Sequence, residues 1–215
     1  MNRQKILDRL KDSGIIAVIR LDGVENLDKI IDALAKGGVQ ALEVTMTTPN
    51  AVAIIRDISF SLSEDFLIGA GTVLNTDTAK EVIDAGAQFV VSPVFKPSII
   101  EIVHQYDKVA ISGAFSPTEI LSAWETGADI VKIFPATVLG PVYFKDIHGP
   151  LPQVKLTPTG GVNLDNAEEF IRCGAVCLGV GTALLDKKLI KNQDWDALEE
   201  KARQFKAAVE RGRKG

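Results

Sequence analysis

The stretch IVKIFP at residues 130–135 decides how the chain is expected to fold. Its β-branched and aromatic side chains, apolar on both faces and followed by a proline, predict a short buried strand. Lys132 lies inside this strand, where burial disfavours the charged ammonium and lowers the pKa of the amine. A neutral amine can attack a carbonyl and form a Schiff base. The alternative is a lysine that extends from the strand end into water or pairs with a carboxylate, because lysines are rarely fully buried.

Apolar segments of the same kind recur along the chain, and they begin near residues 15, 41, 67, 89, 109, 130, 155 and 177. An amphipathic helix over residues 3–12 precedes the first of them. Helical segments are predicted from the Asp22-Gly23 turn to about residue 36, over 49–58, 76–85, from 97, over 117–125, 143–148, from 163 and over 195–211. Strands that are apolar on both faces are typical of a parallel sheet covered by helices.

Eight such strand–helix units predict an α/β fold, a (β/α)8 TIM barrel with an extra N-terminal helix, formed by residues 1–215 as one domain. The rival is an open doubly wound sheet. The near-equal spacing of the units and the absence of G-x-G-x-x-G after the first strand argue against that rival. In a barrel, the active site lies at the carboxyl ends of the strands and in the loops that follow them.

The composition excludes several classes of partner. The net charge is −4, and the chain lacks a basic patch with interleaved aromatic residues, which a nucleic-acid-binding protein would show. No apolar run reaches the roughly 18 residues of a membrane helix. Residues 1–10 lack the apolar segment of a signal peptide. These features predict a cytoplasmic protein that binds neither nucleic acid nor membrane.

Few side chains are available to bind a metal ion. Cys173 and Cys177 are spaced C-x3-C, and no further cysteine or nearby histidine completes a zinc site. His104 and His148 are far apart in the sequence. We therefore predict no metal and no cofactor, and we expect both cysteines to be small buried residues.

Glu43, in the predicted strand ALEVT at residues 41–45, is the expected partner of Lys132. Burial raises the pKa of a glutamate, whereas a nearby ammonium or iminium lowers it. In either case the side chain can transfer protons, directly or through one water molecule. The alternative is a structural ion pair between Glu43 and Lys132, although desolvation can cancel the Coulomb gain of a buried pair.

Two glycine-containing loops predict an anion site. The loop after the seventh strand contains Thr159, Gly160 and Gly161, and the loop after the eighth contains Gly181 and Thr182. Backbone N–H groups at such turns and at a helix N-terminus bind anions. Barrels commonly hold a phosphate at the loops after strands seven and eight. The alternative is that the glycines only form tight turns.

Arg20 ends the first predicted strand. Its guanidinium can form two parallel hydrogen bonds with a carboxylate or a phosphate. The alternative is an ion pair at the surface. Both interpretations remain open from the sequence.

Five motifs occur in register along the chain: LEVT at 42–45, GAGTV at 69–73, VSP at 91–93, VKIFPA at 131–136 and PTGGV at 158–162. Together they resemble the motifs of the class I KDPG/KHG aldolases. The resemblance implies a (β/α)8 fold, usually a homotrimer, without a metal. It also implies cleavage of 2-dehydro-3-deoxy-6-phosphogluconate to pyruvate and glyceraldehyde 3-phosphate. Many members also cleave 4-hydroxy-2-oxoglutarate to pyruvate and glyoxylate.

The resemblance also implies roles for individual residues. Lys132 matches the Schiff-base lysine of the family, and Glu43 matches its general acid/base. The candidate substrate-binding residues, from the strand ends and the resemblance together, are Arg20, Thr45, Thr72, Pro93, Phe134, Thr159, Gly160, Gly161, Gly181 and Thr182. Thr47 is a departure, because many members carry at this position an arginine that holds the pyruvate carboxylate. Arg20 or backbone amides must then bind that carboxylate.

Three alternatives to this interpretation stay open. The substrate of the aldolase could be 2-dehydro-3-deoxy-6-phosphogalactonate. A sugar-phosphate isomerase or epimerase would share the glycine-rich loops but would need no Schiff-base lysine. A barrel that only binds a metabolite or a partner would need neither Lys132 nor Glu43.

Overall fold

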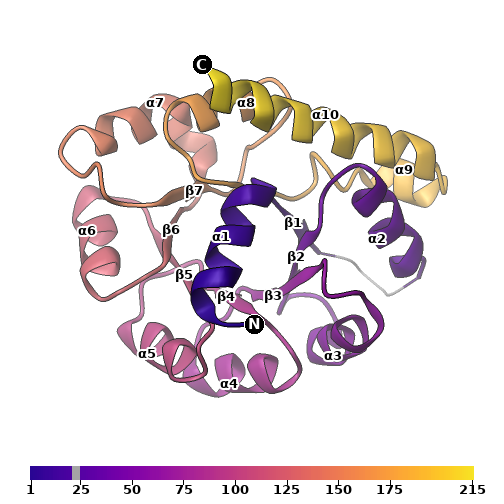
Figure 1. The fold of residues 1–215 in the computed structure, drawn as a ribbon, viewed down its shortest axis with the longest axis horizontal. Coiled ribbons are helices and arrows are strands. Elements are labelled where there is room, and N and C mark those ends of the chain that lie inside the picture. The colour runs from indigo at the N-terminus through magenta and orange to yellow at the C-terminus, as the bar shows by residue number, and fades with distance from the viewer. Residues whose placement is uncertain (21–24) are drawn as a thin grey trace.

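The structure is a computed structural model, and it describes residues 1–20 and 25–215. Within these residues, eight parallel strands form one sheet in the order β7-β6-β5-β4-β3-β2-β1-β8. The strands are β1 (Ile15–Ile19), β2 (Ala41–Thr45), β3 (Leu67–Gly71), β4 (Phe89–Val91), β5 (Val109–Ala114), β6 (Ile130–Ile133), β7 (Leu156–Pro158) and β8 (Leu178–Val180). Isolated parallel bridges join Leu156 to Ala175 and Thr159 to Gly179, at the two ends of this order. The strands therefore form a nearly closed ring, and the predicted TIM barrel is confirmed (Figure 1).

Helices surround the ring of strands (Figure 1). In the described part of the chain they are α1 (Arg3–Ser13), α2 (Leu27–Lys36), α3 (Ala51–Ser61), α4 (Thr76–Asp84), α5 (Pro97–Gln105), α6 (Pro117–Glu125), α7 (Ala136–His148), α8 (Ala167–Arg172), α9 (Lys187–Lys191) and α10 (Trp195–Lys214). α2 illustrates why they pack on the strands: Leu27, Ile30, Ile31 and Leu34 repeat at helical spacing and are buried. α1 is the exception, because it lies across the ring in Figure 1 instead of beside it.

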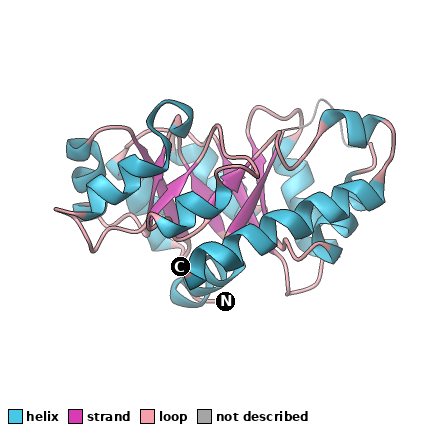
Figure 2. Cartoon of the chain, turned by 90° about the horizontal axis from the view of Figure 1, so that it is seen from above, coloured by secondary structure: helices cyan, strands magenta, loops and turns pink. Residues whose placement is uncertain are grey.

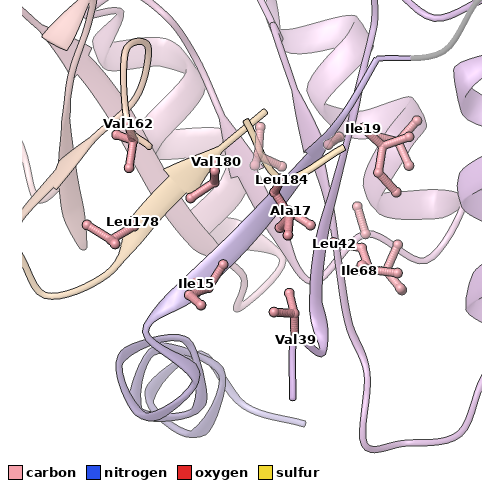
Figure 3. Close-up of a cluster of buried hydrophobic side chains, with 14 of the residues drawn as sticks. Ile15, Ala17, Ile19, Val39, Leu42, Ile68, Val162, Leu178, Val180 and Leu184 are labelled. Atoms are coloured by element: carbon pink, nitrogen blue, oxygen red, sulfur yellow. The ribbon is translucent and has the colours of Figure 1, made fainter. Parts of the chain in front are cut away.

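The alternation of side chains along each strand separates two apolar layers. Outward side chains belong to a core cluster that includes helix residues such as Ile30 and Leu34. Figure 3 shows Ile15, Ala17 and Ile19 of β1 within this cluster. Inward side chains fill the lumen of the barrel together with three residues of α1, and this lumen cluster includes Ile6, Leu7, Leu10, Ile16, Ala41, Leu67, Phe89, Val109 and Ile130. Because α1 covers the amino-terminal end of the strands, the polar residues of the lumen lie toward their carboxyl ends.

The two terminal helices are joined by hydrogen bonds. Arg213 of α10 donates through Nη1 to the carbonyl of Asp12 at 3.1 Å, and Lys206 donates through Nζ to the carbonyl of Ser13 at 2.8 Å. Carbonyls in the last turn of a helix have no partner within the helix, so the basic side chains stabilise the end of α1. Consistent with this contact, both chain ends lie on the same side of the strands in Figure 2.

The helices α7 and α8 begin at least four residues away from the predicted positions. α7 begins at Ala136 instead of residue 143, and it is interrupted at Gly140, which has φ of 67° and ψ of −179° and is followed by Pro141. Gly140 and Pro141 are helix-breaking residues, so the sequence did not predict that the turn before them belongs to the same helix. α8 begins at Ala167 instead of near Asn163, because the Asn163 side chain accepts N–H groups of the next residues and forms a turn.

Two further differences concern short segments. α9 was not predicted, and it has no buried residue that would produce an apolar periodicity. The predicted start of the second helix at the Asp22-Gly23 turn lies outside the described residues, whereas α2 itself begins at Leu27. Neither difference moves a strand, so the carboxyl ends of the strands carry the residues that the sequence places there.

Candidate active site

The side chain of Lys132 points into the barrel because side chains alternate between the two faces of β6. Ile130 belongs to the lumen cluster, so the side chain two residues later points to the same side. Lys132 pairs in register with Gly113 of β5 and Thr157 of β7, and it is 5% exposed. Burial lowers the pKa of its amine; the nearby carboxylate of Glu43 opposes this shift. The amine is therefore biased toward the neutral, nucleophilic form.

Glu43 reaches the lumen from the opposite side of the ring. It lies two residues after the lumen residue Ala41 on β2, so its side chain points to the same side. β2 and β6 are four positions apart in the order of eight strands. Glu43 is 2% exposed, and its Oε1 has no hydrogen-bond partner in the described part of the protein. Burial raises the pKa of this carboxyl group, while the positive charges of Lys132 and Arg20 oppose the shift. The structure thus brings together the two residues predicted to be catalytic, each affecting the ionisation of the other.

Phe134 and Arg20 lie at the mouth of the barrel. The Nζ atom of Lys132 is 5.0 Å from the centroid of the Phe134 ring, which covers the amine although the ring itself is 39% exposed. Arg20 directly follows β1 and is exposed. Burial lowers the pKa of Lys132 and raises that of Glu43; the positive charge of Arg20 adds to the first shift and opposes the second.

The predicted threonines of β2 and β3 differ in their surroundings. Thr45 is fully buried, and its hydroxyl lies 3.3 Å from the carbonyl of Ile19 and 2.9 Å from the hydroxyl of Thr47. The Thr45 hydroxyl is therefore bonded to protein groups. Thr72, directly after β3, has φ of 62°, a left-handed conformation that is unusual for a β-branched residue. Such strained positions occur at ligand sites, so this observation is consistent with the prediction for Thr72.

Glycines inside the strands make the close approaches at the carboxyl end possible. A Cβ atom on Gly113 would lie 2.1 Å from the carbonyl carbon of Pro93, and one on Gly179 would lie 2.3 Å from Oγ1 of Thr159. Pro93 is thus brought close to β5, and Thr159 is brought close to β8. Pro93 is half-buried. From the sequence, Gly179 was assigned to the anion-binding loop after the eighth strand, and Gly113 was given no role in the site. The signal that could have found Gly113 is a glycine within a strand, which often marks a close approach of another group.

The two predicted anion-binding loops lie next to each other. The bridge between Thr159 and Gly179 connects the ends of β7 and β8, where the two loops begin. Gly160 and Gly161 have φ of 89° and 75°, values that favour glycine. Gly181 is half-buried and Thr182 is exposed, directly after β8. The prediction that a helix starts immediately behind the glycines is wrong, because an asparagine turn separates α8 from the loop.

The histidines and cysteines have protein partners. Nε2 of His148 is 2.9 Å from the carbonyl of Val154, and Nε2 of His104 is 3.0 Å from a carboxylate oxygen of Asp129. Cys177 is buried, which raises the pKa of its thiol to about 11, whereas Cys173 is half-buried, so it was wrong to expect both to be buried. Among the described residues, no group of three or more potential ligands could hold a metal ion. In the same residues, no helix has the length and apolar character needed to cross a membrane.

Comparisons with known proteins agree with this arrangement. Residues 6–201 match the family model described as KDPG and KHG aldolase. The chain is 33% identical over 196 residues to the 2-dehydro-3-deoxy-phosphogluconate aldolase of Haemophilus influenzae, covering 91% of this chain and 92% of that protein. It is 33% identical over 197 residues to the KHG/KDPG aldolase of Escherichia coli K12, with the same two coverages of 91% and 92%.

A solved structure shows the same fold. It is the KDPG aldolase of Legionella pneumophila with pyruvate captured at low pH as a covalent carbinolamine intermediate. That structure superimposes with a TM-score of 0.84 at 32% identity, over 92% of this chain and 96% of that one. From the family match over most of its length and these relatives, the chain belongs to the KDPG and KHG aldolase family and is an aldolase, a carbon–carbon lyase.

Proposed function

We propose that the chain is a class I aldolase that cleaves 2-dehydro-3-deoxy-6-phosphogluconate to pyruvate and glyceraldehyde 3-phosphate. We include 4-hydroxy-2-oxoglutarate, cleaved to pyruvate and glyoxylate, as a second substrate. The observation that carries the proposal is Lys132, which is 5% exposed in the lumen, with a lowered pKa and a carboxyl group on the opposite strand. A primary amine whose neutral form is favoured in this way is suited to attack a ketone.

The proposed reaction begins at the C2 ketone of the substrate. The Lys132 amine adds to C2, and loss of water from the carbinolamine gives an iminium. The positive iminium favours the ionised form of Glu43, which then removes the proton of the C4 hydroxyl, directly or through a water molecule. The C3–C4 bond breaks, its electron pair forms the enamine, and the aldehyde leaves. Protonation of the enamine at C3 and hydrolysis of the iminium release pyruvate and restore the amine.

The phosphate of the substrate is assigned to the loops after β7 and β8. The side-by-side position of Thr159 and Gly179, and the left-handed backbone of Gly160 and Gly161, support this assignment. Turns of this kind direct backbone N–H groups at an anion. Binding of the remote phosphate would help to position C2 and C4 against the two catalytic groups.

The carboxylate of the substrate is assigned to Arg20, together with backbone amides near Thr72 and Pro93. Thr47 takes the place of the arginine that many members of the family use, and its hydroxyl is already bonded to Thr45. Arg20, in contrast, is exposed at the end of β1, and its charge acts on both Lys132 and Glu43. A guanidinium in this place would hold a carboxylate near the amine.

We also propose a homotrimer in the cytoplasm, with residues 1–215 as one domain. Large apolar side chains are exposed in the loops after β3 to β6 and on α7, and they are Leu74, Val94, Phe115, Phe134, Val138 and Val142. The loops after β3 to β6 follow neighbouring strands, so exposed apolar side chains on them support a surface that contacts another protein. Sedimentation equilibrium tests the trimer, and Val142→Glu is expected to dissociate it.

Direct assay of pyruvate release tests the proposed activity. Wild type, Lys132→Met and Glu43→Gln are incubated with the phosphogluconate and phosphogalactonate substrates and with 4-hydroxy-2-oxoglutarate, each with and without a chelator. We expect the wild type to have its highest kcat/KM with the phosphogluconate compound and Lys132→Met to have none. Higher kcat/KM with the phosphogalactonate compound would change the substrate but keep the chemistry. No release of pyruvate from any of them would favour an isomerase or a barrel that only binds metabolites.

A further inference from the structure

Gly71, the last residue of β3, lies beside the Glu43 carboxyl group with no room for a side chain. β3 pairs with β2, and Gly71 is in register with Thr45. A Cβ atom on Gly71 would lie 1.9 Å from Oε1, 2.6 Å from Cδ and 2.8 Å from Cγ of Glu43. All three distances are below 3.0 Å, which real Cβ atoms essentially never show, and all three are to one side chain. The space that this glycine leaves open is therefore occupied by Glu43.

The backbone of Gly71 does not itself require glycine. Its φ is outside the left-handed region, so an alanine could adopt the same conformation. Other glycines of the barrel differ in what a Cβ would meet: the ring of Phe89 for Gly69 and the main chain of Pro93 for Gly113. A methyl group at Gly71 would instead meet the flexible end of one side chain, which can rotate away. We therefore expect the carboxyl group, and not the strand, to move.

The atom nearest to Gly71 is also the one that lacks a partner. Oε1 of Glu43 is buried, and in the described part of the protein no group forms a hydrogen bond with it. The direction of a carboxyl oxygen without hydrogen bonds depends on the shape of its surroundings. On the side of Oε1 that faces β3, the neighbouring residue is Gly71, which has no side chain.

We propose that Gly71 is a positioning residue that, by having no side chain, lets the Glu43 carboxyl group take the place in the lumen from which it exchanges protons with the substrate. This inference rests on the proposed function, because it assumes that Glu43 is the acid/base. It adds that the reaction depends on the absence of a methyl group at one position of β3. Gly71 has no side chain that could react, so its proposed role is to position the group that does.

The test compares Gly71→Ala, Glu43→Asp and the double variant. In Gly71→Ala we expect kcat to fall about 10- to 100-fold, since a displacement of about 1 Å can cost 100-fold. KM and the midpoint of thermal unfolding should stay near the wild-type values. Aspartate is one methylene shorter, so its carboxyl group withdraws from the added methyl. The loss in the double variant should therefore be about tenfold smaller than the product of the two single losses.

Gly69→Ala is the matched control, because it adds a methyl on the same face of the same strand. That methyl meets Phe89 instead of Glu43, so we expect lower thermal stability and an unchanged kcat for the folded fraction. Unchanged kcat in Gly71→Ala, multiplicative losses in the double variant, or a Gly71→Ala protein that does not fold would each overturn the proposal. The last outcome would mean that the strand, and not the carboxyl group, takes up the clash.

Two measurements with pyruvate separate this proposal from the proposed function. Borohydride traps pyruvate on Lys132 if the Schiff base forms, and exchange of the pyruvate methyl protons with D2O reports the proton transfer at C3. We expect Gly71→Ala to be trapped to the same extent as wild type but to exchange more slowly. Absence of trapping in the wild type would refute the proposed function. Trapping with normal exchange in Gly71→Ala would refute only the role of Gly71.

Discussion

Replacement of Lys132 by methionine should abolish pyruvate release and, at neutral pH, make the protein more stable. Lys132 is 5% exposed, and burial disfavours its charge. Methionine has a similar length and no charge to desolvate. Removal of one member of a buried pair is usually destabilising, because a charge remains without a partner. Here burial also raises the pKa of Glu43, so the remaining carboxyl group can be protonated. We therefore expect a gain in the free energy of unfolding that is smaller than the roughly 1–4 kcal/mol found when both members of a buried ion pair are replaced by apolar residues.

The stability gained by Lys132→Met should decrease as the pH rises. The pKa of folded Lys132 is lowered from 10.5, so between the lowered value and 10.5 the unfolded chain binds more protons than the folded protein. Wild-type stability therefore rises with pH in this window, with a slope of at most about 1.4 kcal/mol per pH unit. Methionine does not titrate. The advantage of Lys132→Met should be largest at the acid side of the window and should decrease as the pH approaches 10.5.

Urea denaturation at several pH values between about 6 and 10 measures this difference, with m-values checked for two-state behaviour. Lys29→Met is the control, because Lys29 is an exposed lysine on α2. This variant measures the effect of removing a lysine that is not buried. A Lys132→Met protein that is less stable than wild type at pH 7, or a difference that stays constant with pH, would show that burial does not disfavour the ammonium form.

Three further predictions follow from the site. Glu43→Gln should lower kcat by about 10²- to 10⁴-fold while pyruvate still adds to Lys132, and a normal kcat would exclude Glu43 as the acid/base. Gly161→Ala should raise KM for the phosphorylated substrate but not for 4-hydroxy-2-oxoglutarate. The reason is that Gly161 has φ of 75° and that an added Cβ would lie 2.8 Å from Thr137, so the loop would be distorted. An equal rise in KM for both substrates would show that this loop does not bind the phosphate. Treatment with a chelator should leave kcat/KM unchanged in the pyruvate assay, and a loss restored by a divalent cation would point to metal catalysis.

The placement of Lys132 and Glu43 could be predicted from the sequence because two regular features determine it. Side chains alternate along a strand, and parallel strands of a barrel end at one face, so two charged residues in apolar strands are placed in one lumen. Ile130 and Ala41 in the lumen cluster bear out this reasoning. The lowered pKa of Lys132 followed from the same burial.

Other features depend on distances between strands, which the sequence does not contain. The room for Glu43 comes from Gly71, and the approach of Pro93 comes from Gly113, in each case through a contact between neighbouring strands. The turn at Asn163 also escaped prediction, because asparagine side chains either start a helix or accept N–H groups in a turn, and the neighbouring chain decides which.

Borohydride reduction in the presence of pyruvate, followed by peptide mapping, tests most directly whether the buried amine is the nucleophile. We predict a reduced pyruvate adduct on Lys132 in the wild type, and no adduct in Lys132→Met. Protein that remains unlabelled, or a label on another lysine, would contradict the account.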